Sequence, residues 1–259
     1  MNTSFYDVHK TFLRGLAARD IAEPLPSFDR TTPAAEARSS LQAAGHDVAG
    51  VRQAGFVTGY IECQDLGDGS CGDSMRPFDE DTVIPDSASI TEVVLKLNQY
   101  PRLFVRSLGT VAGLVTRSDL MDPPVRMWLF GMITVLEMRF LQLIEAQFSD
   151  ESWSRYLSPA RLEKARELQV ERQRRGQNTN LLDCLQFSDK AQIVVRDESL
   201  RSQAGIASRR RGDEVIKNLE RLRNNLAHTQ DIIAFDWQTI VAIVENLERL
   251  VALGTVERS

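Results

Sequence analysis

Two stretches of the first half share one pattern: Gly55-Phe-Val-Thr-Gly59-Tyr-Ile-Glu-Cys-Gln-Asp65-Leu66 and Gly109-Thr-Val-Ala-Gly113-Leu-Val-Thr-Arg-Ser-Asp119-Leu120. The second follows the first at a constant offset of 54 residues, and five of the twelve aligned positions are identical, including both glycines and the aspartate. Self-similarity at a fixed period indicates one structural unit written twice. Because one such unit has too little core to fold alone, we expect the two copies to pack side by side.

Each copy has the pattern of an extended run, a helix and two strands. The predicted helices span 33–44 and 89–99, and the second has an apolar stripe at helical spacing, formed by Ile90, Val93, Val94 and Leu97. A short hairpin follows, with its turn at Ser107-Leu108-Gly109, and after Asp65 and Asp119 the chain should enter a second helix or turn. The first half is therefore predicted to be a pair of βαββα repeats.

The run Gly113-Leu-Val-Thr116-Arg-Ser-Asp119-Leu120 resembles the end of a CBS repeat, and 59–66 resembles its partner. The resemblance implies a tandem CBS module that binds an adenosyl nucleotide such as AMP, ADP or ATP as a regulatory ligand. It also implies that Thr116 and Asp119 hold the ribose hydroxyls, which suits a carboxylate acceptor beside a hydroxyl.

The first copy departs from this pattern, because Glu62 stands where the hydroxyl residue belongs. Asp65 would keep a ribose contact, but the Glu62 carboxylate would repel a nearby phosphate, so we expect one competent site. The alternative role for Thr116 and Asp119 is to cap the helix that follows, a common task for these residue types.

The sequence Asp122-Pro123-Pro124 marks the predicted seam between a domain at 1–122 and a domain at 123–259, because paired prolines suit the first turn of a new helix. Four main helices are predicted, a long one with an apolar face over 127–148, a charged one at 158–174, and two more at 213–228 and 237–253, the last capped by Asp236. One or two short helices are expected within 181–198. With no strand pattern between them, these helices predict an all-α bundle, so the whole chain is of the α+β class.

The third main helix carries the segment Leu222-Arg223-Asn224-Asn225-Leu226-Ala227-His228. At roughly 100° per residue an apolar stripe forms on one face, while Asn224 and His228 point to the opposite face. The stripe consists of Val215, Leu219, Leu222 and Leu226. His228 is therefore predicted either to be exposed or to face a partner.

This Arg-Asn-x-x-x-His spacing on the third of four helices resembles the HEPN ribonuclease family over 124–253. The resemblance implies a homodimer in which two motifs face each other and cleave RNA without a metal or another cofactor. His228 has the chemistry of a general base or acid, Arg223 can donate two hydrogen bonds to charge on phosphorus, and Asn224 can orient the histidine or the substrate. One histidine cannot easily serve as base and acid in one step, so the two copies of a dimer would supply both.

The composition of the chain bears on metal binding, nucleic-acid binding and location in the cell. The chain is 42% hydrophobic and 26% charged, and its three cysteines form no C-x-x-C, which argues against a zinc site. Residues 1–122 hold 11 basic and 17 acidic side chains, and residues 123–259 hold 20 basic and 19 acidic ones, so the overall charge does not indicate a nucleic-acid binder. Basic residues cluster at 172–175 and at 209–211. These clusters are either solvated surface charge or contacts to phosphate. We expect no secretory signal, no membrane span and a cytoplasmic location, since charged residues interrupt the apolar run at 127–148.

The sequence therefore predicts a nucleotide-regulated endoribonuclease. The competing interpretation is a non-catalytic, adenine-nucleotide-sensing scaffold, or a toxin component, whose helical domain binds a protein partner.

Overall fold

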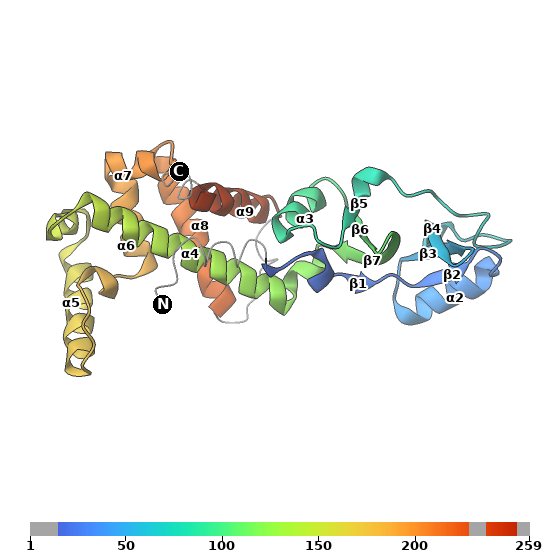
Figure 1. Cartoon of the computed structure of the whole chain (residues 1–259), viewed down its shortest axis with the longest axis horizontal. Helices are drawn as coiled ribbons and strands as arrows, with labels where there is room; N and C mark the ends of the chain where they lie inside the picture. Colours follow the sequence, from blue (N-terminus) through green and yellow to red (C-terminus); the bar gives the residue numbers. More distant parts are fainter. Residues whose placement is uncertain (1–14, 228–236, 253–259) are drawn as a thin grey trace. The chain divides into compact units, whose positions relative to one another are not determined.

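The computed structural model describes residues 15–227 and 237–252. Within these residues the chain forms two compact units, one over 15–125 and one over 126–252 apart from the gap. The first unit contains all the strands of the described chain, and the second is helical (Figure 1). His228 and Asp236, which the sequence analysis singled out, lie outside the described residues.

The internal repeat is reproduced strand by strand. The first copy consists of β2 (Ser27–Asp29), α2 (Ala34–Ala44), β3 (Val48–Gln53), β4 (Phe56–Glu62) and the 3-10 helix η2 (Cys63–Asp65). The second consists of β5 (Val83–Pro85), α3 (Ile90–Leu97), β6 (Arg102–Ser107), β7 (Thr110–Thr116) and the 3-10 helix η4 (Ser118–Met121). The predicted helices and hairpins are confirmed, and the element after each hairpin is a turn of 3-10 helix.

Both hairpins keep the 54-residue offset at each strand end and have a register shift at equivalent places, next to Val51 in one and Val105 in the other. Their turns also match. Ala54 and Gly55 have φ of 50° and 85°, and Leu108 and Gly109 have φ of 49° and 84°. Two consecutive residues with positive φ are the requirement of a tight hairpin turn, which explains a glycine in each copy.

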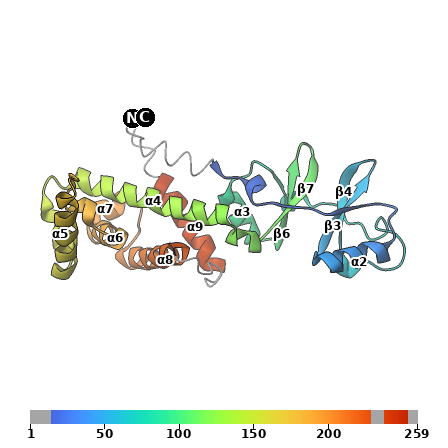
Figure 2. The same ribbon diagram turned by 90° about the horizontal axis from the view of Figure 1, so that it is seen from below.

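The two copies are interwoven. One sheet has the order β2-β3-β4 and the other β1-β7-β6-β5. Strand β1 (Glu23–Pro24) precedes the first copy in sequence but pairs antiparallel with β7 of the second (Figure 1). Figure 2 shows the β3-β4 hairpin of the first copy next to the β6-β7 hairpin of the second. A shared core fills the space between the sheets, where the rings of Tyr60, Phe78 and Phe104 lie with centroids 4.8–5.7 Å apart.

The helical unit contains α4 (Pro123–Gln147), α5 (Pro159–Arg174), α6 (Phe187–Arg196), α7 (Glu198–Gln203), α8 (Arg209–Ala227) and α9 (Trp237–Ala252). The prediction that the third main helix begins at 213 is wrong by one turn. Ser208 Oγ accepts a hydrogen bond from the Arg211 backbone at 3.2 Å, so the helix begins at Arg209 and the arginine triplet forms its first turn.

Many of the buried side chains of the helical unit come from α4. Phe140 stacks on Phe187 of α6 at 6.2 Å, and the buried ammonium of Lys190 lies 2.8 Å from a carboxylate oxygen of Glu137. By contrast α5 buries only Ala165, so it lies on the outside of the unit and the short helix α6 takes its place in the core. By length and composition alone α4 could cross a membrane, and 56% of its most apolar window is buried among the described residues.

We predict that Phe104→Ala lowers the free energy of unfolding by about 3–5 kcal/mol, because it empties the aromatic core shared by both sheets. Val170→Ala, on the exposed side of α5, is the control and should change it by less than about 0.5 kcal/mol. Urea unfolding followed by circular dichroism measures both variants. Equal stability of the two would contradict the shared core.

Candidate nucleotide cleft and helical motif

The end of β7 is organised by Asp119. The Thr116 backbone N–H donates to Asp119 Oδ2 at 2.6 Å, and the Thr116 hydroxyl donates to the same oxygen at 3.1 Å. The hydroxyls of Thr116 and Ser118 lie 2.6 Å apart. Asp119 stands in the first turn of η4, so it also closes the turn that follows the strand.

Asp119 is only 6% exposed. Burial raises the pKa of its carboxyl, the two hydrogen bonds from Thr116 oppose that rise, and the negative charges of Glu23 and Asp122 add to it. A carboxylate that is costly to keep ionised gains from any ligand that brings hydroxyl donors to it.

A cleft of about 380 Å³ lies beside this turn. Its walls come from β1, from the turn between α2 and β3, from the start of β6 and from the end of β7, including Glu23, His46, Asp47, Arg102, Thr116 and Ser118. Of the residues predicted to bind a nucleotide, Thr116 lines the cleft and Asp119 lies behind Thr116, bonded to it. Both copies of the repeat thus contribute to one cleft.

Arg102 gives this cleft a positive charge. Its Nη1 atom is buried, lies 3.8 Å from Glu62 Oε1 and makes no hydrogen bond to any described residue. A guanidinium beside hydroxyl groups suits a phosphate or another oxyanion, and here the Glu62 carboxylate already lies within ion-pair distance of it. Sequence analysis missed Arg102 and Ser118, because neither is matched in the first copy, where the equivalent positions are Val48 and Gln64.

The equivalent place in the first copy is built differently. Arg76 forms ion pairs with both Glu62 (3.6 Å) and Asp65. Asp65, predicted to contact a ribose, therefore already has a charged partner. Arg76 comes from the connector between the copies, a region that the motif comparison did not include.

On α8 the predicted apolar stripe is found, with Ile216 added to it, whereas Leu226 is half-buried. Asn224 is exposed, as predicted for the face opposite the stripe, and Arg223 is half-buried at the edge of the stripe. The guanidinium of Arg126, in the first turn of α4, donates to the backbone carbonyls of Asn225 (3.2 Å) and Leu226 (3.3 Å). This long-range contact holds the helical turn that carries Arg223 and Asn224, and sequence analysis did not foresee it.

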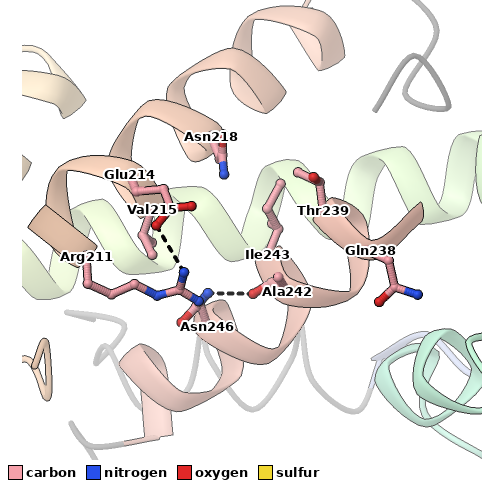
Figure 3. Close-up of a pocket in the computed structure, with 9 residues that line it drawn as sticks. All are labelled: Arg211, Glu214, Val215, Asn218, Gln238, Thr239, Ala242, Ile243 and Asn246. Carbon is pink, nitrogen blue, oxygen red and sulfur yellow. Dashed lines mark hydrogen bonds and ion pairs between the residues drawn. The ribbon is translucent and has the colours of Figure 1, made fainter. Parts of the chain in front are cut away.

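A smaller cavity of about 160 Å³ is lined by residues of α8 and α9 (Figure 3). Val215 and Ile243 form its apolar side, Arg211 pairs with Glu214 at 3.1 Å, and the Asn246 amide donates to the Ala242 carbonyl at 2.6 Å. Because Arg223 and Asn224 do not line it, this cavity is separate from the motif.

No metal site can be assigned within the described part of the chain, where no three His, Cys, Asp or Glu side chains are grouped to hold an ion. Cys63, Cys71 and Cys184 are free thiols. Burial, followed by the nearby Glu36 carboxylate, raises the pKa of the Cys71 thiol, so it stays protonated and packs as a small apolar side chain.

No family model matches the chain, and no curated protein matches its sequence. Among solved structures, CBSX2 in complex with AMP is similar over 44% of this chain and 98% of its own, with 19% identity and a TM-score of 0.39. The CBS-pair protein CBSX2 from Arabidopsis thaliana is similar over 43% and 95%, with 18% identity and a TM-score of 0.38. The CBS domain of a bacterial CNNM/CorC family Mg²⁺ transporter in complex with ATP is similar over 47% and 94%, with 13% identity and a TM-score of 0.37.

These similarities each cover less than half of the chain, and the nucleotides belong to those proteins. The elements over 15–125 follow the order predicted from the sequence, a strand, a helix and two strands in each copy. The HEPN resemblance of the helical unit stays a prediction.

We predict that Asp119→Asn leaves the protein at least as stable at neutral pH but weakens AMP binding about ten-fold or more. Since the folded-state pKa of Asp119 is raised, its ionised form opposes folding, and stability should rise as pH falls through that pKa. An amide oxygen can still accept from Thr116, but it offers the ribose no charge.

Calorimetric AMP titration and thermal unfolding of Asp119→Asn, with Asp122→Asn as the neighbouring control, separate the two roles. Lost stability with unchanged AMP affinity would leave Asp119 only the capping role.

Proposed function

We propose that the chain is a nucleotide-regulated, metal-independent endoribonuclease that acts as a homodimer. An adenosyl nucleotide binds in the cleft at Thr116, and RNA is cleaved at Arg223, Asn224 and His228. The observation that carries the proposal is the short connection between the two places, through η4, the first turn of α4 and the Arg126 contact with α8.

The cleft has the chemical groups that an adenosyl nucleotide needs. The hydroxyls of Thr116 and Ser118, backed by the Asp119 carboxylate, suit the ribose, and Arg102 suits the phosphate. The structure thus supports the ligand implied by the CBS resemblance in the second copy, and Arg102 favours a ligand that carries phosphate.

The proposed reaction is a transesterification. The ribose 2′-oxygen attacks phosphorus while His228 of one protomer removes its proton, the bond to the 5′-oxygen breaks, and the second His228 of the dimer protonates that leaving oxygen. Arg223 stabilises the charge on the phosphoryl oxygens, and Asn224 orients the substrate. Support comes from Asn224, which is exposed on the face of α8 opposite the apolar stripe, and from Arg223, which is half-buried at the edge of that stripe.

The proposed coupling between the nucleotide cleft and the motif on α8 runs along consecutive residues of the chain. Asp119 belongs to η4, which ends at Met121, and α4 begins at Pro123. Arg126 lies in the first turn of α4 and bonds the α8 carbonyls that directly follow Arg223 and Asn224. A nucleotide with different affinities for two states of η4 would therefore bias the turn that carries the motif.

A non-catalytic scaffold is the second candidate. Met127 and Phe130 of α4 are 70% and 44% exposed and lie three residues apart on one helix, as expected of a protein contact. The same two exposed side chains would also suit the contact between the protomers of a homodimer. A cytoplasmic location belongs to both proposals.

We predict that the purified full chain cleaves a mixed RNA pool in EDTA, that AMP or ATP changes the rate, and that His228→Ala reduces cleavage about 100-fold or more. Arg223→Ala should have a comparable effect, because it removes stabilisation of the developing charge. Gel analysis of end-labelled RNA measures the rates.

Arg210→Ala is the matched control, since it removes one exposed arginine from the other end of α8 and should leave cleavage within about two-fold. If no RNA cleavage by the purified protein depends on His228, the ribonuclease proposal fails and a protein partner of the helical unit should be sought.

A further inference from the structure

The two copies of the repeat each have a neighbouring segment at the free edge of their last strand. At β7 this segment is β1, where Glu23 pairs with Leu114. At β4 it is the connector between the copies, where Arg76 and Tyr60 exchange two backbone hydrogen bonds of 2.8 and 2.9 Å. Tyr60 and Leu114 are 54 residues apart, so Arg76 occupies in the first copy the place that Glu23 occupies in the second.

The repeated glycines make this approach possible. A Cβ atom on Gly59 would lie 2.5 Å from the Arg76 carbonyl oxygen, and one on Gly113 would lie 3.4 Å from the Glu23 carbonyl oxygen. Since no Cβ tolerates a 2.5 Å contact with backbone, Gly59 is needed for the connector to reach β4.

The residue at this edge position differs in charge between the two copies of the repeat, and it changes the charge around the end of the last strand of each copy. In the second copy Glu23 adds negative charge near Asp119, and the Asp119 carboxylate accepts a hydrogen bond from the Thr116 hydroxyl. In the first copy the Arg76 guanidinium bridges Glu62 and Asp65, the counterparts of Thr116 and Asp119. Arg102 also lies 3.8 Å from a carboxylate oxygen of the same Glu62.

The connector that carries Arg76 is itself anchored. Backbone hydrogen bonds tie it to the start of α2 and the residues before it, from Ala34 to Gly69 (2.9 Å), from Cys71 to Thr32 (2.8 Å) and from Gly72 to Arg30 (2.9 Å). The Cys71 side chain is fully buried. The Arg76 side chain is 49% exposed, and its backbone belongs to this anchored segment.

We propose that Arg76 is an internal ligand of the first half-site. It pairs with the Asp65 carboxylate, which would otherwise contact a ribose, and with the Glu62 carboxylate, and so limits the chain to one nucleotide. The block is Arg76 together with Asp65, rather than repulsion by Glu62 alone. This inference rests on the proposed nucleotide site in the second copy.

Calorimetric titration of the full chain with AMP tests the inference. We expect one nucleotide per chain for the unaltered protein and also for Glu62→Thr, which restores the hydroxyl residue but leaves the pair between Arg76 and Asp65. Glu80→Thr is the matched control, because Glu80 pairs with Arg106 outside the cleft. Two nucleotides per chain in the unaltered protein or in Glu62→Thr would overturn the proposal.

A double-mutant cycle between Arg76→Ala and Asp65→Ala, read as thermal midpoints, tests the pair without a nucleotide. Non-additive losses are expected, and additive losses would overturn the proposal. If no protein binds AMP but the cycle is non-additive, the nucleotide site has failed and the internal ligand remains.

Discussion

The first unit depends on the pairing of β1 with β7. A sheet of three short strands and one helix has too little apolar surface to fold alone. By carrying β1 across to the second sheet, the chain closes both sheets over one core, in which Tyr60, Phe78 and Phe104 meet. The cleft is a consequence of the same crossing, because β1 and the turn after α2 form one wall and the ends of β6 and β7 form the other.

A nearly identical backbone in the two copies carries different chemistry. The hairpins agree in strand ends, register shift and turn geometry, yet the edge residue is an acid in one copy and a base in the other. Since the hairpins match, side chains that differ between the copies would account for a difference in ligand binding: Glu62 against Thr116, Val48 against Arg102, Gln64 against Ser118 and Arg76 against Glu23. An effect of the nucleotide on the helical unit would then start from one copy only, through η4 and α4.

Much of this fold was predictable from local pattern. The 54-residue offset, the stripe on α3 and the hairpin glycines depend on neighbouring residues, and the structure confirms them. The pairing of β1 with β7 was not predictable, because a two-residue strand has no periodicity. Arg76, Arg102 and Arg126 were missed because their partners lie 11 to 100 residues away and are brought near only by tertiary packing. The placement of His228 remains a prediction from α8.

The central claim is that the second copy forms the one nucleotide site of the chain. A crystal structure of the full chain grown with AMP tests it most directly. The account predicts one nucleotide per chain, with its ribose at Thr116 and Asp119, its phosphate within hydrogen-bond distance of Arg102, and Arg76 still paired with Asp65. A nucleotide bound at Glu62 and Asp65, or a cleft that stays empty at saturating AMP, would contradict it.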